Sequence, residues 1–146
     1  MAQDAIQLLD ADHQRVEALY KDFKAAGGNR DAQLALAQTI CAELVLHAMV
    51  EEEIFYPAYA HATGDEQAVE HANKEHGELK ELIAKVPQAE NLEGAMEVIM
   101  RRTMHHVDEE RREMFAKARA SGMELATVGG RIQTRRDEVM AAVQGA

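Results

Sequence analysis

Apolar residues recur at the spacing of an α-helix through four long stretches of this sequence. The stretches span residues 5–26, 31–60, 66–86 and 92–120. In each of them a hydrophobic side chain returns every three or four positions, so that one face of a helix can be buried. Only two prolines occur, Pro57 and Pro87, which leaves long segments free to be helical. This pattern limits the fold to helices that pack on helices.

Short turn signals separate the four stretches, at Gly27-Gly28-Asn29, Thr63-Gly64-Asp65 and Pro87. No stretch shows the pattern of alternating apolar and polar residues that is typical of a β-strand. Long helices joined by short turns pack as antiparallel neighbours. We therefore predict an all-α fold, an antiparallel up-down-up-down four-helix bundle.

The end of the sequence is less regular. Residues 121–146 carry a weaker amphipathic pattern, which Gly129-Gly130 interrupts. They predict a short C-terminal helical extension after a bundle that occupies about residues 5–120. We also expect Pro57 to kink or end the second helix. Residues 1–146 then form one domain, which suits a chain of this length.

Composition excludes several classes of function. The formal net charge of −10 argues against binding to nucleic acid or to an anionic membrane. The first residues do not resemble a signal peptide, and we expect no stretch to approach the roughly 18 apolar residues of a membrane-spanning helix. The single cysteine, Cys41, cannot form an internal disulfide and suits a reducing compartment. The sequence thus predicts a cytoplasmic protein.

The apolar stripes contain polar residues that a simple core would exclude. Each stripe carries a histidine near its middle, and two stripes add a glutamate one turn later: His13, His47, His76 and His106, with Glu51 and Glu110. Burying an ionised carboxylate costs several kcal/mol unless a partner compensates it. A bound cation is such a partner, and imidazole and carboxylate donors suit iron, manganese or zinc. The six residues therefore predict a metal site between the four helices.

The spacing of these residues supports the same interpretation. Positions i and i+4 of a helix differ by about 40° in direction and about 6 Å in height, so both side chains reach one pocket. Five of the seven histidines have a glutamate four places later. Of these glutamates, Glu17, Glu75 and Glu109 fall beside the stripes and are expected at the surface. Two alternatives remain for the inner pairs: buried hydrogen-bonded His–Glu pairs without metal, or helices rotated to face water.

Four short blocks around these histidines occur in the order and spacing of a known family. The blocks are Leu9-x-x-Asp12-His13, His47-x-x-x-Glu51-x-x-Ile54-Phe55-Tyr56-Pro57, Glu75-His76-x-x-x-Lys80-x-Leu82-Ile83 and His105-His106-x-x-x-Glu110-x-x-Glu113-Met114-Phe115. Over about residues 6–120 the sequence resembles the hemerythrin-like HHE cation-binding domains. The resemblance implies an antiparallel four-helix bundle that holds two non-heme iron ions with an oxo or hydroxo bridge. It implies histidine ligands at His13, His47, His76 and His106, and bridging carboxylates at Glu51 and Glu110.

The sequence departs from the respiratory hemerythrins in one ligand. Those proteins carry His-x-x-x-His on the third helix, whereas the positions four away from His76 are Ala72 and Lys80. A fifth histidine is missing unless His71 or His105 replaces it. His71 lies five residues before His76, about 140° away on an ideal helix. We therefore expect an open position on iron, most accessible beside His76 and Ala72.

Two functions fit this resemblance. The first is a diiron protein that binds O₂, NO or peroxide at the open position, with or without redox turnover. The second is an iron- or oxygen-responsive module that controls a protein partner without catalysis. The fold and the metal do not choose between them, and the protein partner is not identified by the sequence.

Overall fold

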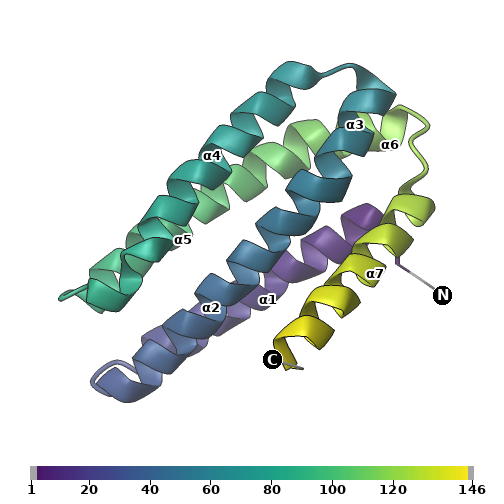
Figure 1. The fold of residues 1–146 in the computed structure, drawn as a ribbon. Helices are drawn as coiled ribbons and strands as arrows, with labels where there is room; N and C mark the ends of the chain where they lie inside the picture. The colour runs from purple at the N-terminus through teal and green to yellow at the C-terminus, as the bar shows by residue number, and fades with distance from the viewer. Residues whose placement is uncertain (1–2, 145–146) are drawn as a thin grey trace.

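The computed structural model describes residues 3–144, and within this range every regular element is helical. The α-helices are α1 (Ala5–Ala25), α2 (Arg30–Val50), α3 (Tyr56–Thr63), α4 (Glu66–Ala84), α5 (Leu92–Glu109), α6 (Phe115–Ala120) and α7 (Leu125–Gln144). Two π-helical turns, η1 (Glu51–Phe55) and η3 (Glu110–Met114), join α2 to α3 and α5 to α6. A 3₁₀ turn, η2 (Val86–Gln88), precedes α5. Figure 1 shows the resulting helical bundle, which confirms the predicted fold class.

Side-chain caps set the start of the four bundle helices. A polar side chain accepts a hydrogen bond from the first turn in each case: Asp4, Asn29, Asp65 and Asn91. Such a cap satisfies a backbone N–H that the helix itself leaves without a partner. Gly64 ends α3 with φ of 74°, a left-handed conformation that costs glycine little. The turn signals in the sequence therefore mark real helix ends.

Contacts between neighbouring helices run in opposite directions along the chain. Asp12 of α1 bonds to His47 of α2, and Arg15, three residues later, bonds to Glu43, four residues earlier. The contacts between α4 and α5 follow the same rule: Glu75 with His106, and Glu78 with Arg102. Both helix pairs are therefore antiparallel, as their short connections require.

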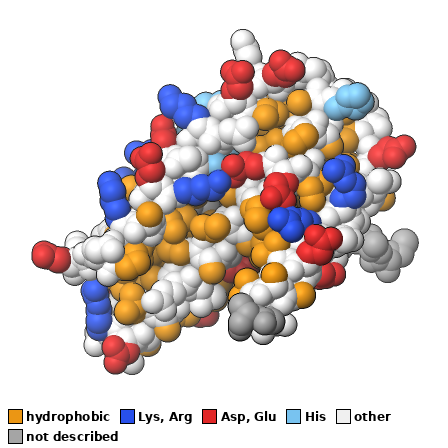
Figure 2. Space-filling view, viewed as in Figure 1, with side chains coloured by type: hydrophobic (Ala, Val, Ile, Leu, Met, Phe, Trp, Pro, Cys, Tyr) orange, Lys and Arg blue, Asp and Glu red, His pale blue; other side chains and the backbone are white. Residues whose placement is uncertain are grey.

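The hydrophobic core is divided into two parts. One cluster lies at the end formed by α3, α6 and the start of α1, and includes Phe55, Tyr59 and Phe115. The other lies towards the turns at Gly27 and Pro87, and includes Phe23 and Ile40. The buried histidines and glutamates form a polar layer between these two clusters. Apart from this layer, hydrophobic side chains pack between the helices and both signs of charge are dispersed over the surface drawn in Figure 2.

Pro57 does not end the second helix. The helix continues from α2 through η1 into α3 and stops only at Thr63. The irregular turn lies immediately before the proline, which occupies the first turn of α3. A proline ring clashes with the carbonyl four residues earlier in a regular α-helix. The wider π turn avoids that clash, so the helix continues past Pro57 with a change of hydrogen-bonding register.

The C-terminal extension is a long helix that docks on one side of the bundle. Helix α7 packs against α1, α2 and η1, on the side away from α4 and α5 (Figure 1). It runs without a break through Gly129 and Gly130, so the expected interruption there is wrong. A Cβ on Gly129 would lie 2.7 Å from the Gln3 carbonyl oxygen and 2.8 Å from the Ala5 nitrogen. Gly129 thus allows α7 to approach the start of α1 closely.

One helical segment has the length and composition of a membrane span. The segment Arg30–Thr63 has a window with mean hydropathy 1.4, contrary to the expectation from the sequence. Length and composition do not separate a spanning helix from the core helix of a bundle. Within the described residues this helix packs against α1, α4 and α7 and carries buried His47 and Glu51. The bundle buries 44% of the residues in that window.

The close approach at Gly129 leads to a test of how α7 docks. We expect Gly129→Ala to lower the free energy of unfolding by about 1–3 kcal/mol, because the added methyl group meets backbone atoms that cannot move aside. Gly130→Ala is the matched control, since a Cβ there has nothing within 4 Å. That change should raise the free energy of unfolding by about 0.5–1 kcal/mol through helix propensity. Urea unfolding measures both, and equal effects would show that α7 does not pack as described.

Candidate metal centre

The bundle brings all six residues of the predicted site together in the polar layer. They form two groups whose ligand atoms lie within 4.8 Å of one another: His13, His47 and Glu110, and Glu51, His76 and His106. Five of the six are buried, and His106 is partly buried. Each group combines two imidazoles with one carboxylate. This arrangement excludes the alternative in which the helices turn these residues towards water.

Each glutamate lies between the two groups. Glu51 Oε1 is 3.1 Å from His47 Nε2 and 3.2 Å from His76 Nε2. Glu110 Oε2 is 3.1 Å from His106 Nε2, while its Oε1 is 3.7 Å from His13 Nε2. Both carboxylates therefore face a histidine from either side of the layer. A carboxylate that bridges two metal ions needs this placement.

A carboxylate orients each of the four imidazoles. The Nδ1 atoms lie 2.8–3.1 Å from carboxylate oxygens in four pairs: His13 with Asp10, His47 with Asp12, His76 with Glu52, and His106 with Glu75. An ionised carboxylate only accepts, so Nδ1–H donates and the Nε2 atom is directed inwards. Metal-binding histidines are held in this way, because the outer hydrogen bond fixes both tautomer and ring orientation.

Three of these four carboxylates are themselves paired with a Lys or Arg side chain. Asp10 Oδ1 accepts from Arg111 Nε at 2.7 Å, and Glu52 accepts from Lys80 Nζ at 2.9 and 3.0 Å. Asp12 accepts a short hydrogen bond from Arg136 of α7. These cations stabilise the ionised carboxylates and thereby the orientation of the imidazoles.

Two tests show that the residues fit metal ions. Glu51 Oε2 and Glu110 Oε1 are buried and have no hydrogen-bond partner within residues 3–144, so each has a free acceptor. The Nε2 atoms of His13 and His47 lie 3.2 Å apart, as do those of His76 and His106. Two nitrogens at ordinary metal–nitrogen lengths of about 2.0–2.1 Å from one ion require such a spacing. The donors, the free acceptors and the spacing all suit a pair of metal ions.

The ionisation of the buried groups points to the same requirement for cations. Burial, and then the neighbouring Glu51 carboxylate, raises the pKa of Glu110 to about 7. Burial and the neighbouring His47 lower the pKa of His13 to about 4, which keeps its imidazole neutral. His47 and His106 shift the other way, because the neighbouring carboxylates outweigh the effect of burial and raise their pKa values to about 10 and about 11. A metal ion must therefore displace a proton from each of these two imidazoles. Two carboxylates this close repel each other in a medium of low dielectric constant. A cation between them relieves that repulsion.

A family model for the hemerythrin HHE cation-binding domain matches residues 4–118 of the chain. The chain belongs to this family. Comparison with curated proteins and with solved structures gave no match. The family and the two groups of donors establish a hemerythrin-like cation-binding domain. The individual ligand roles remain predictions, because family membership alone does not assign them.

The two π turns each place an aromatic residue over the centre of this hemerythrin domain. The Tyr56 N–H bonds to the Glu51 carbonyl, and the Phe115 N–H bonds to the Glu110 carbonyl. An i+5 bond sets each aromatic residue one turn above its glutamate, on the same face. A regular α-helix would turn it about 140° away.

The two aromatic residues differ by one hydroxyl group. The Phe115 ring stacks on His13 with a centroid distance of 6.3 Å. The Tyr56 hydroxyl donates to Glu110 Oε2 at 2.8 Å and lies 3.2 Å from the Nε2 atoms of both His76 and His106. Burial, followed by the Glu110 and Glu51 carboxylates, raises the Tyr56 pKa well above its usual value. The two groups of donors are therefore inequivalent.

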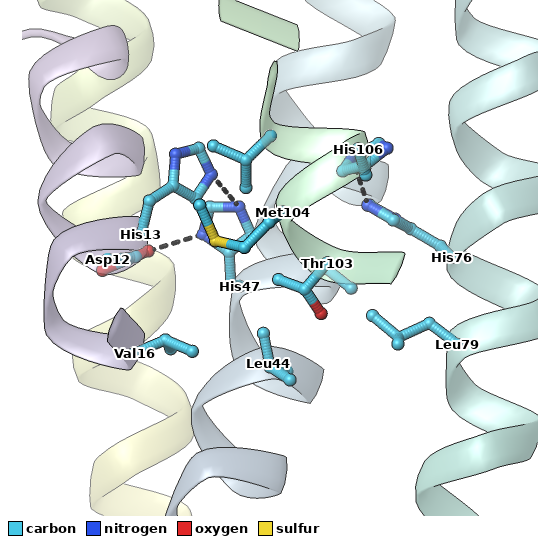
Figure 3. Close-up of a pocket in the computed structure, with 12 residues that line it drawn as sticks. Asp12, His13, Val16, Leu44, His47, His76, Leu79, Thr103, Met104 and His106 are labelled. Atoms are coloured by element: carbon cyan, nitrogen blue, oxygen red, sulfur yellow. Dashed lines mark hydrogen bonds and ion pairs between the residues drawn. The ribbon is translucent and has the colours of Figure 1, made fainter. Parts of the chain in front are cut away.

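Two small cavities reach the centre from opposite sides of the polar layer. The first has a volume of about 30 Å³ and is drawn in Figure 3. Apolar side chains, among them Val16, Leu44 and Leu79, line it below the four imidazoles. The second has a volume of about 50 Å³ and passes Ala72 to reach His106 and Glu110. The expected space beside Ala72 therefore exists, although the Tyr56 hydroxyl fills the position next to His76 Nε2.

The remaining candidates lie outside the centre. His61 is exposed on α3. The side chains of His71 and His105 are 59% and 66% exposed, so neither replaces the missing fifth histidine. Cys41 is buried in the hydrophobic core, where burial raises its thiol pKa to about 11, as expected of a small inert side chain.

Arg136 gives a prediction for the role of α7, which lies beyond the family match. Its side chain is 12% exposed and that of Asp12 is 6% exposed. We expect Arg136→Met to lower the free energy of unfolding by about 3 kcal/mol, because it removes the buried cation paired with Asp12. Within residues 3–144, Asp12 then keeps only His47 and, at 3.6 Å, the half-exposed Arg15. Arg135→Met is the matched control: Arg135 bonds to Glu53 at the surface, and its loss should have a much smaller effect. Urea unfolding with excess chelator measures both, and equal effects would contradict the buried ion pair.

Proposed function

We propose that this domain holds two iron ions between its helices and binds a small oxidant or diatomic molecule, such as O₂, NO or peroxide, at the centre. The observation that carries the proposal is the pair of His–His–Glu groups that share their two carboxylates. Each half of the site would then offer two imidazole nitrogens and an oxygen from each carboxylate. That donor set suits a first-row divalent metal, and membership of the hemerythrin family favours iron.

Iron in such a centre supplies a redox-active Lewis acid to which a small ligand can bind. The surrounding residues set the conditions for that binding. Glu51 and Glu110 offset the positive charge, while Asp10, Asp12, Glu52 and Glu75 hold the imidazoles in place. Four histidines and two carboxylates leave coordination positions free, since octahedral iron takes six donors. A free position is the feature that ligand binding needs.

The apolar cavity is the best candidate for the bound molecule. Its volume of about 30 Å³ exceeds the roughly 10–15 Å³ that a water-sized molecule needs, which suits a diatomic molecule. Its aliphatic walls disfavour ordered water. On the opposite side, Phe115 covers one half of the site and the Tyr56 hydroxyl covers the other. The Tyr56 hydroxyl donates a hydrogen bond to Glu110 Oε2. Because Phe115 has no hydroxyl, the two proposed metal positions have different surroundings.

An iron- or oxygen-responsive module without catalysis is the second candidate function. The docked α7 favours it in one respect, because Arg136 links an element outside the family match to Asp12 and so to His47. We retain the cytoplasm as the proposed location and leave the protein partner unassigned. Binding of a small ligand at the metal separates the two candidates.

Metal stoichiometry is the first test. After anaerobic loading, we expect two iron ions per chain in the wild type and in His61→Ala. His47→Ala and His106→Ala should retain much less iron, because each removes a donor that a carboxylate has already oriented. Elemental analysis of the desalted proteins measures the content. Equal content in all four proteins would refute the assignment of these ligands.

Azide binding tests the cavity. We expect azide to change the ligand-to-metal absorption of the diferric protein. Val16→Met should fill the cavity and weaken azide binding by about 10- to 100-fold, because overpacking a site costs about 1–3 kcal/mol. Leu19→Met, on the same helix and outside the cavity, should leave the affinity unchanged. A wild-type spectrum that neither azide nor, under anaerobic conditions, NO alters would rule out the small-ligand function and favour the sensing one.

A further inference from the structure

Two His-x-x-x-Glu pairs of the sequence supply none of the six predicted ligands of the buried centre. One is His71 and Glu75 on α4, and the other is His105 and Glu109 on α5. The structure brings them together at the surface. His71 Nε2 lies 3.1 Å from Glu109 Oε2 and 3.5 Å from Glu75 Oε1, while His105 Nε2 lies 3.0 Å from Glu109 Oε1. The ligand atoms of His71, Glu75 and Glu109 therefore lie within 4.8 Å of one another outside the centre, and His105 joins them through Glu109.

Glu75 is the exception among the four carboxylates that orient the imidazoles. The other three each pair with a Lys or Arg: Asp10 with Arg111, Asp12 with Arg136, and Glu52 with Lys80. Within residues 3–144, Glu75 and Glu109 have no Lys or Arg partner within 4.0 Å. At the place where the other three carry a cation, Glu75 faces His71 and Glu109 instead. A bound metal ion would supply the positive charge that this position lacks.

The cluster also lies at the mouth of the second cavity. The cavity of about 50 Å³ is lined by His71, Glu75 and Glu109 at the surface and by His106 and Glu110 at the centre. Glu110 is 3% exposed, and its Oε1 has no hydrogen-bond partner within residues 3–144. Glu113 adds a further carboxylate to the wall. A passage lined by carboxylates attracts cations and raises their local concentration.

We propose that His71, Glu75, Glu109 and His105 form an outer site for a divalent first-row metal ion, which passes Fe²⁺ inwards to the buried centre. The donor set of imidazole and carboxylate matches that of the centre, so the same ion binds at both sites. The outer site is open to solvent and therefore binds more weakly and exchanges faster. Glu75 belongs to both sites, since its Oε1 also accepts from His106 Nδ1 at 2.8 Å. The loading role depends on the proposed diiron function, whereas the outer site itself does not.

Cobalt binding tests the outer site. The diferric wild type, freed of loose metal, should bind one further Co²⁺ in a calorimetric titration, and the Co²⁺ absorption should show nitrogen and oxygen donors. His71→Gln/Glu109→Gln should abolish this binding. His61→Gln/Glu81→Gln removes the same groups at exposed positions outside the cluster and should retain it. Surface changes of this kind rarely alter stability by more than about 0.5 kcal/mol, so all three proteins should fold. Glu75 is left unchanged because it positions His106.

Iron uptake tests the loading role. Apo protein mixed anaerobically with limiting Fe²⁺ should fill its centre about tenfold more slowly in His71→Gln/Glu109→Gln than in the wild type or the control, with the same final content. Competition with a coloured chelator in a stopped-flow instrument measures the rate. Failure of the wild type to bind the extra Co²⁺, or retention of that binding by the double variant, would overturn the outer site. Equal uptake rates would overturn loading.

The same experiments keep this inference distinct from the proposed function. A wild type that holds two irons without the extra Co²⁺ refutes the outer site and leaves the diiron function standing. A wild type that binds one Co²⁺, lost in the double variant, but never holds two irons supports the outer site and refutes the diiron function. The iron content of the wild type is therefore measured before either titration.

Discussion

The burial of two carboxylates among four imidazoles is the constraint on which the rest of this bundle depends. Glu51 and Glu110 are 0% and 3% exposed, so their charge has almost no access to water. An ionised group in that position costs several kcal/mol, which a core of this size cannot absorb repeatedly. The surrounding structure is arranged around that cost: the hydrophobic core is split in two, four further carboxylates orient the imidazoles, and three cations support those carboxylates. Metal ions complete the compensation.

Two of the helical segments that build the centre follow one plan with one difference. Each carries a His-x-x-x-Glu pair followed by a π turn and an aromatic residue, His47–Glu51–Tyr56 in one and His106–Glu110–Phe115 in the other. The π turn has a local purpose, because it lets the histidine, the glutamate and the aromatic residue share one face of a helix. The exchange of tyrosine for phenylalanine then places a single hydroxyl group on one side of the centre. The hydroxyl oxygen of Tyr56 is therefore what makes the two repeated segments differ at the centre.

The bundle could be predicted from the sequence, and so could the shared location of the six candidate residues. Both predictions depend on helical periodicity, which is the strongest local signal. The sequence did not predict the π turns, since a change of hydrogen-bonding register leaves no mark on an apolar stripe. From the sequence, Tyr56 is most simply a core residue that could approach the site; the π turn after Glu51 is what brings its hydroxyl to the centre. The sequence also did not predict the polar partners of the imidazoles. Glu75, which bonds to His106, was expected at the surface. Arg136, which bonds to Asp12, lies 124 positions away from it in the sequence. Pairings between helices depend on packing angles, which periodicity does not specify.

The two cavities give the centre two different surroundings. On the side of Val16 and Leu44 the walls are aliphatic, so a neutral diatomic molecule gains more there than an ion does. On the side of Glu109 and Glu113 the walls are acidic, which favours a cation and opposes peroxide anions or azide. If both entered through the aliphatic cavity, the metal ion would have to cross apolar walls. If both entered through the acidic cavity, an anionic ligand would have to pass carboxylates. The polar layer separates the two cavities, so metal loading and ligand binding can proceed from opposite sides of the same six residues.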